Sequence, residues 1–369
     1  MATLVVSDLH LGSRSGSDLA RRPELRARLL DALDGVERLV LLGDVLELRD
    51  RPLAEALEGS RPFFEDLGEA LGDREAVIVP GNHDHHLIAG WMSRRRAEGS
   101  PVGLAERVAP ADASDAAAAL PGWLGRAPLS MSYPGLWIRP DVYALHGHYL
   151  DRHVTVPSFE PLAVRASERI QRREGGPSEG VEAYEAAIAP VCAALYELAQ
   201  SRTIGRLGGG GHVSQRAYRV LAGDGRGRRP LHHRLFSQYG FPAAVAAINA
   251  VGIGPVLADL SGRELRRSGL RAIGQVVENL GIEAEHVIFG HTHRGGPFGD
   301  DESEEWTAPG GARLMNTGSW VFEPLFAGRT PNASPYWPGG VVHVPDRGAP
   351  ELRRLLGYKA AADFEPVAD

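Results

Sequence analysis

The chain has 369 residues, 43% hydrophobic and 24% charged, which supplies a large core for two domains or for one domain with a big insertion. Its formal net charge of -7 argues against a general nucleic-acid-binding protein. A single cysteine, Cys192, rules out an intramolecular disulfide, and the N-terminus leads directly into an apolar run, so we predict a protein of the reducing cytoplasm.

Short apolar runs alternate with helical patterns over the first ninety residues. Runs of mostly β-branched and apolar residues occupy 3–7, 38–42 and 76–79, and an amphipathic helix begins at Pro23 between the first two. A further helix is predicted at 63–71. Nearly continuous apolar strands joined by helices indicate an α/β protein with a parallel sheet covered by helices.

The alternation becomes looser toward the C-terminus. An irregular excursion at 88–140 precedes a fourth apolar run at 141–145, and an amphipathic helix at 262–280 leads to a fifth run at 286–289. Beyond these, the runs at 312–316 and 341–344 are predicted as strands of a second sheet.

The residues between the fourth run and the last long helix are too many for a loop. The segment 149–261 is mainly helical in character, with a glycine-rich loop and a basic loop inside it. We therefore predict a largely helical inserted cap subdomain at 149–261, and a main domain formed by 1–148 and 262–369.

Each of the five apolar runs ends in side chains that can bind metal ions. They are Asp8 and His10, Asp44, Asn82 with His83, His146, and His291 with His293. Ligands of open α/β sheets bind beyond the carboxyl ends of the strands, so strands of one sheet would bring these groups together. One such motif can arise by chance, whereas five in order after apolar runs form a strong signal.

The chemistry of these side chains indicates the kind of metal. The set is large enough for two cations, and the Asp44 carboxylate could bridge them because each oxygen can face one cation. A mixed His, Asp and Asn set without cysteine favours manganese, iron or zinc over a structural zinc site. We expect two divalent ions, with manganese favoured.

The same motifs resemble those of a known family, the calcineurin-like metallophosphoesterases. The motifs are Asp8-x-His10, Gly43-Asp44, Gly81-Asn82-His83-Asp84, His146 and Gly290-His291-Thr292-His293. The resemblance covers roughly 1–90, 138–150 and 262–325. It implies two facing mixed β-sheets flanked by helices, and metal-dependent hydrolysis of a phosphomonoester, phosphodiester or pyrophosphate by a metal-bridging hydroxide.

The resemblance also implies a role for each motif residue. One metal would be bound by Asp8, His10, Asp44 and His293. The other would be bound by Asp44, Asn82, His146 and His291. His83 would lie beside the phosphate as general acid or charge stabiliser, with Asp84 orienting its ring. The adjacent His85 and His86 have no place in either ligand set, and we expect ordinary loop residues there.

One feature is similar to the branch of this family that hydrolyses UDP-2,3-diacylglucosamine. Glu47 stands at the end of the second motif, as in that branch, and is not expected to bind metal. His83 and His148 stand where that branch usually has Arg and Asp. A phosphate-containing substrate, nucleotide- or lipid-linked, is thus one expectation.

The predicted cap and the excursion carry further candidates for substrate binding. The basic loop contains Arg228 and Arg229, and 235–258 has no charged residue. The cap could simply pack on its own core below a solvated loop. Alternatively, it overhangs the metals, holds phosphate with its arginines and offers its apolar stretch to an acyl chain or a membrane surface. Arg94 is either a phosphate clamp or part of an exposed basic helix face, and His148 is another candidate.

Two other functions fit the motifs. A manganese-dependent nuclease shares such motifs, although the acidic charge and the lack of interleaved aromatic and basic residues argue against nucleic acid as a partner. A non-catalytic, metal-bound scaffold could bind a protein partner through the cap.

Overall fold

The computed structural model describes residues 1–156, 158–201 and 262–364. Arg228, Arg229 and the uncharged stretch 235–258 lie outside the described residues. The predicted binding roles of those two arginines and the contact of the cap with lipid or membrane therefore stay predictions.

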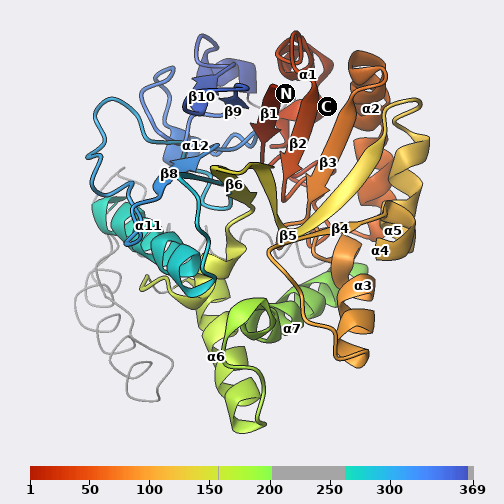
Figure 1. Ribbon diagram of the computed structural model, residues 1–369. Coiled ribbons are helices and arrows are strands. Elements are labelled where there is room, and N and C mark those ends of the chain that lie inside the picture. The colour runs from red at the N-terminus through yellow and green to blue at the C-terminus, as the bar shows by residue number, and fades with distance from the viewer. Residues whose placement is uncertain (157, 202–261, 365–369) are drawn as a thin grey trace, which may run out of the picture.

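A mixed β-sheet forms the centre of the described structure (Figure 1). Its ten strands are β1 Thr3–Val6, β2 Arg38–Leu42, β3 Glu75–Val79, β4 Ala105–Val108, β5 Leu129–Arg139, β6 Val142–Leu145, β7 His286–Phe289, β8 Arg313–Asn316, β9 Gly340–Val344 and β10 Glu351–Arg354. The order is β10-β9-β1-β2-β3-β5-β6-β7-β8, and β4 pairs with β5 beside this path.

Strand β5 joins the two halves of the sheet. Near its start it runs parallel to β3, with Leu129 opposite Ala76, and near its end it runs antiparallel to β6, with Gly135 opposite Leu145. The sheet is therefore continuous and nearly closed, like a barrel. The two separate facing sheets that the resemblance implied are not clearly present, because one long strand belongs to both halves.

The inside of the curled sheet has its own hydrophobic cluster. Val5 and Val77 from one half share it with Leu136, Val142 and Ile288 from the other half. Their neighbours along the strands point to the opposite face, where helices cover them. Since both faces are buried, the strands are apolar almost throughout, which is why the sequence reveals them as continuous runs.

Helices flank the sheet on its outer face and extend beyond one of its ends. The described α-helices are α1 Pro23–Asp31, α2 Leu53–Leu71, α3 His86–Ala97, α4 Pro110–Ala113, α5 Asp115–Ala119, α6 Phe159–Arg173, α7 Gly180–Gln200, α11 Gly262–Asn279 and α12 Pro324–Ala327. Short 3-10 helices are η1 Leu19–Arg21, η2 Leu120–Gly122, η3 His148–Arg152 and η6 Ala361–Phe364. In Figure 1, α1 and α2 lie beside β1 to β3, and α6 and α7 lie at the opposite end of the molecule.

The excursion at 88–140 is more regular than the sequence indicated. It contains most of α3 and all of β4, α4, α5 and β5. Pro134 and Gly135 argue against a strand, since proline lacks a donor for the ladder and glycine weakens it. In the structure they lie where β5 passes from pairing with β4 to pairing with β6.

The described part of the predicted cap, residues 149–201 without 157, is helical. Helix α6 packs against α7 and η3, α7 contacts α3, and η3 contacts α11. These helices thus adjoin elements that precede and follow them in the chain. Among the described residues, no helix combines the length and the apolar character needed to cross a membrane.

The inner cluster should contribute strongly to stability. Ile288 is 0% exposed, whereas Leu325 on α12 is 37% exposed. Ile288→Ala should lower the free energy of unfolding by about 2–5 kcal/mol because it leaves a cavity between the sheet halves. Leu325→Ala should change it by no more than about 0.5 kcal/mol. Urea unfolding with the slope compared between variants measures both, and equal effects would contradict a packed interior.

Candidate metal centre

The candidate ligands lie in the loops that follow five strands. Asp8 and His10 follow β1, Asp44 follows β2, Asn82 and His83 follow β3, His146 follows β6, and His291 and His293 follow β7. Because the sheet curls, the loops of its two halves meet at one edge. Within the described residues three overlapping groups have ligand atoms within 4.8 Å of one another. They are Asp8, His10 and His293; His10, Asp44 and His83; and Asp44, His146 and His291.

His146 turns its second ring nitrogen toward two acceptor oxygens. Its Nδ1 is 2.9 Å from the carbonyl oxygen of Leu42, so Nδ1 carries the proton and donates it. Its Nε2 lies 3.2 Å from Asp44 Oδ2 and 3.2 Å from Asn82 Oδ1. Three lone-pair-bearing atoms that face one another repel unless a proton or a cation lies between them.

His291 adds another acceptor at the same place. Its Nε2 is 3.2 Å from Asp151 Oδ1, and a carboxylate can only accept, so this nitrogen bears the proton. The other nitrogen, Nδ1, lies 3.1 Å from Asn82 Oδ1. The Asn82 amide group donates to Glu160 at 3.0 Å, which leaves its carbonyl oxygen facing the imidazoles. Together, the ring nitrogens of the two histidines and the oxygens of Asn82 and Asp44 are atoms that could bind a divalent cation.

A second group of acceptors faces the Asp44 carboxylate from the other side. His10 Nδ1 is 2.9 Å from Glu47 Oε2, so its Nε2 faces His293 Nε2 at 3.1 Å and Asp44 Oδ2 at 3.7 Å. His293 Nε2 is also 3.4 Å from Asp8 Oδ1. These atoms fit a second cation, with Asp44 shared between the two groups.

The electrostatics of the cluster favour positive charge. Burial alone would lower the pKa of His146, but the Asp44 carboxylate outweighs it and raises the pKa to about 10. Burial alone would raise the pKa of Asp8, yet the hydrogen bond and charge of His293 hold it below its usual value. The pKa of Asp44 is likewise held well below its usual value, against burial, by His146 and His83.

The backbone of the site is strained. Six described residues other than glycine have positive φ, and five of them are candidate ligands. They are Asp8 at 54°, His10 at 46°, Asp44 at 50°, His291 at 67° and His293 at 58°. Side chains rarely adopt this left-handed conformation, which costs about 1–3 kcal/mol per residue. Such strain concentrates at functional sites, where the surrounding structure enforces it.

The glycine of the third motif is required by close approach. A Cβ atom on Gly81 would overlap the Asp44 carboxylate and the His146 ring. Glycine therefore allows the loop after β3 to approach the loops after β2 and β6 closely enough for Asn82 to join the cluster.

Adding that Cβ should disrupt the centre. Gly81→Ala should lower the free energy of unfolding by about 1–3 kcal/mol through overpacking and weaken Mn²⁺ binding at least about tenfold, because Asp44 must move. Gly122→Ala is the control, since nothing lies within 4 Å of a Cβ there. Denaturation in EDTA and calorimetric Mn²⁺ titration measure the two effects, and wild-type Mn²⁺ affinity in Gly81→Ala would contradict this role.

His83 has a different partner from the one expected. Its Nδ1 is 2.6 Å from Glu47 Oε2, and its side chain is 19% exposed. The buried Asp84 carboxylate instead accepts hydrogen bonds from the backbone N–H groups of Val45 at 2.8 Å and Gly81 at 2.6 Å. The expectation that Asp84 orients the His83 ring is therefore wrong in this structure: Glu47 contacts the ring, and Asp84 ties two loops together.

Glu47 is a site residue that sequence reasoning undervalued. Its carboxylate contacts both His10 and His83. Burial raises the pKa of Glu47, but the charge of His83 and the hydrogen bonds from both rings lower it below its usual value. The sequence feature that could have identified Glu47 as a site residue is its position three residues after Asp44, in the same loop.

His85 and His86 are more than ordinary loop residues, because both contact helix α7. His85 Nε2 is 3.1 Å from the buried carboxylate of Glu185, which also accepts a hydrogen bond from Tyr149 at 2.6 Å. The His86 ring stacks on Tyr196, with ring centroids 3.7 Å apart. The end of the loop after β3 and the start of α3 are thus each held against α7 by one side chain.

Two predicted substrate contacts have other surroundings. Arg94 is exposed, and its guanidinium donates to the carbonyl oxygen of Asp112. His148 is only 2% exposed, and neither ring nitrogen has a hydrogen-bond partner in the described structure. Burial, together with the charge of His146, holds the pKa of His148 well below its usual value. A neutral, buried ring has little surface for a substrate.

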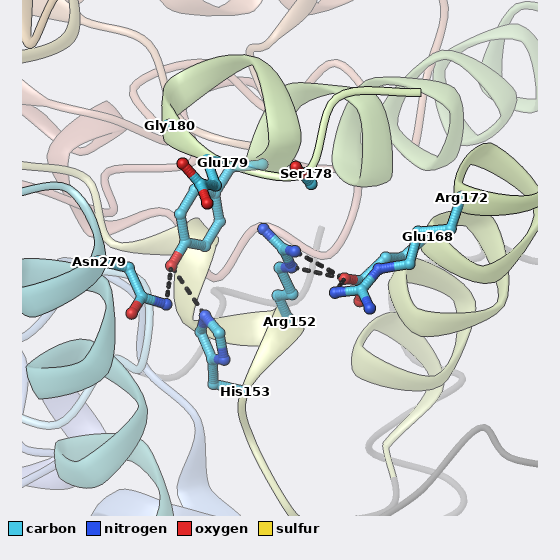
Figure 2. Close-up of a pocket in the computed structure, with 9 residues that line it drawn as sticks. Arg152, His153, Glu168, Arg172, Ser178, Glu179, Gly180 and Asn279 are labelled. Carbon is cyan, nitrogen blue, oxygen red and sulfur yellow. Dashed lines mark hydrogen bonds and ion pairs between the residues drawn. The ribbon is translucent and has the colours of Figure 1, made fainter. Parts of the chain in front are cut away.

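A cavity of about 490 Å³ is lined by residues that include members of η3, α6, α7 and α11 (Figure 2). Its lining includes Arg152, which pairs with Glu168 at 2.7 Å. His153 Nε2 lies 2.8 Å from the hydroxyl of Tyr184, to which Asn279 also donates. These polar groups are mutually paired, so the cavity lacks a free cation of its own for an anion.

The His153 ring should make stability depend on pH. Burial and the Arg152 charge lower the pKa of His153 from 6.5 to about 4. The unfolded chain therefore binds the proton first, and stability present above pH 6.5 is lost as pH falls toward 4. Between pH 8 and 5 this loss is about 2 kcal/mol. In His153→Gln, the free energy of unfolding should fall by about 2 kcal/mol less between pH 8 and pH 5 than in wild type, as measured by urea unfolding at both pH values. Equal decreases in the two proteins would contradict a lowered pKa of His153.

Comparisons with known proteins add little. Neither a protein-family model nor a curated protein matches the chain. One similar solved structure is a mutant of a cold-active protein tyrosine phosphatase, 12% identical over 95% of this chain and 80% of that chain, with a TM-score of 0.26. A likeness of this degree carries no argument. What the fold and the site define is an α/β protein with a buried His, Asp and Asn cluster that can bind metal ions.

Proposed function

We propose that this chain is a metal-dependent phosphoester hydrolase with two divalent ions in its site. The proposal depends on one observation: two sets of possible metal ligands lie on either side of Asp44, which belongs to both, and His83 lies next to them. The order of the motifs, which resembles that of the calcineurin-like metallophosphoesterases, supports the same reaction. One ion would be held by Asp8, His10, Asp44 and His293. The other would be held by Asp44, Asn82, His146 and His291.

The ligand types set the chemistry. Imidazole, carboxylate and amide oxygen suit manganese, iron or zinc, with manganese favoured. When bound, two such cations would activate water and neutralise the charge that develops on a phosphoryl group. The carboxylates Asp8 and Asp44 supply the negative charge that retains the cations at this edge of the sheet.

His83 is the side chain placed to handle a proton. Glu47 binds its Nδ1, so Nε2 is the nitrogen that faces the centre, 4.0 Å from Asp44 Oδ2. A proton on Nε2 could pass to the leaving oxygen or stabilise charge there, a role that contributes about 10²–10⁴-fold to rate. Partial exposure gives a substrate access to this ring.

The substrate class proposed is a phosphate-containing small molecule, including nucleotide- or lipid-linked compounds. The net charge of -7 weighs against nucleic acid as substrate. Nuclease activity and a non-catalytic scaffold are the outcomes that the experiment below has to separate from this proposal.

The test combines metal analysis with hydrolysis of bis-p-nitrophenyl phosphate in Mn²⁺. Wild type should bind two metals per chain and turn over the substrate. Asp44→Asn should lose metal and rate together, since it removes the shared ligand. His83→Ala should keep both metals and lose about 10²–10⁴-fold in kcat.

The controls are Asp141→Asn and His343→Ala, which change the same residue types on other elements of the sheet. Both should match wild type. Fewer than two metals in wild type, with no rate difference among the variants, would reject the enzyme. Two metals without hydrolysis would favour the scaffold, and salt-sensitive DNA binding with Mn²⁺-dependent cleavage would favour the nuclease.

A further inference from the structure

Two carboxylates from the helical segment after β6 contact candidate ligands. Asp151, in η3, lies 3.2 Å from His291 Nε2 through Oδ1. Glu160, in the first turn of α6, accepts a hydrogen bond from Asn82 Nδ2 at 3.0 Å. Both ligands belong to the group with Asp44 and His146.

Each contact selects which atom of the ligand faces the centre. An amide side chain can turn either its oxygen or its NH₂ inward, and an NH₂ would repel a cation. Because the NH₂ group of Asn82 donates a hydrogen bond to Glu160, the Asn82 side-chain oxygen faces His146 and His291. Similarly, Asp151 accepts a hydrogen bond from the Nε2–H group of His291, so the lone pair of Nδ1 is available to a metal. Such outer contacts fix ligand tautomer and orientation.

The other group is supported from a different part of the chain. There Glu47, from the loop after β2, accepts a hydrogen bond from the Nδ1–H group of His10. The Nε2 atom of His10 then faces His293. Glu47 belongs to the predicted main domain, whereas Asp151 and Glu160 belong to the segment that the sequence predicts as an insertion.

Arg49 connects the two supports. Its guanidinium pairs with Glu160 at 2.9 Å, and its backbone N–H donates to Glu47 at 2.9 Å. The Arg49 side chain is 8% exposed, so the charge of Glu160 is balanced in a largely buried place. Asp151 is independent of this link, which makes it the cleaner probe.

From these contacts we infer that Asp151 and Glu160 are positioning residues for one metal only, the one held by Asp44, Asn82, His146 and His291. The segment before α7 is then part of the metal centre and not merely a cover above it. The inference rests on the metal binding in the proposed function, but it does not depend on hydrolysis.

The test is a calorimetric Mn²⁺ titration, with bound metal per chain measured after desalting. Asp151→Asn and Glu160→Ala should each weaken one binding step by about 10–100-fold and leave the other unchanged. Electron paramagnetic resonance at limiting Mn²⁺ should change from a spin-coupled spectrum to a mononuclear one. Glu47→Gln should weaken the other Mn²⁺-binding step. The double variant that combines Asp151→Asn and Glu47→Gln should therefore bind Mn²⁺ more weakly at both steps.

Matched variants separate positioning from folding. Glu168→Gln changes the same residue type on the same helix, where Glu168 pairs with Arg152 and Arg172, and it should bind Mn²⁺ like wild type. Glu160→Gln, which keeps an acceptor oxygen for the Asn82 amide, should lose less affinity than Glu160→Ala. In an Asn82→Ala background, Glu160→Ala should have no further effect on Mn²⁺ binding. Circular dichroism in EDTA checks the fold of each variant.

Several results would overturn the inference. These are equal weakening of both steps by Asp151→Asn or Glu160→Ala, no weakening of either, or a wild type that binds fewer than two metals. A wild type that binds two metals but does not hydrolyse phosphoesters would reject the proposed function and leave this inference standing. The two failures are therefore distinguishable.

Discussion

Hydrogen-bond acceptors, the atoms that can donate a lone pair to a metal ion, gather at one buried edge of this sheet, and much of the surrounding structure brings them together. His146 Nε2 lies 3.2 Å from both Asp44 Oδ2 and Asn82 Oδ1, and His291 Nδ1 lies 3.1 Å from the same Asn82 oxygen, so a proton or a cation has to lie between these atoms. Burying such groups unpaired costs several kilocalories per mole. A positive charge at the centre would remove this cost, so that any cation bound there would also stabilise the fold of these loops.

The curled sheet explains how the acceptors meet. Loops after β1, β2 and β3 come from one half, and loops after β6 and β7 come from the other, joined by β5. The left-handed backbone at Asp8 and four other candidate ligands turns each chain sharply beyond its strand. The packed inner cluster between the halves holds both sets of loops in register, which is how strain at the loops can persist.

The loop after β3 links this centre to the helical segment. Asn82 and His83 face the acceptors, while His85 and His86 contact α7 and Asn82 also binds Glu160 on α6. The residues that follow β3 therefore connect the candidate ligands with helices 78 and 100 residues further along the chain, through the Asn82–Glu160 and His85–Glu185 contacts.

The sequence by itself determined the α/β class, the main apolar strands and the residue types that follow them, because those signals are local. A buried strand needs a run of apolar residues, so each run, and the residues that follow it, can be recognised in the sequence. Each candidate ligand could therefore be named from its position after a strand, without knowledge of its partners.

Only the tertiary structure decided which side chains support those ligands and how the sheet closes. Glu47 contacts His83 where Asp84 was expected, and Asp151 and Glu160 were missed altogether. The strand β5 was hidden by Pro134 and Gly135, which lie at its change of partner. Hydrogen bonds between residues far apart in the chain leave no periodic pattern in sequence, since their geometry depends on how the strands and helices pack.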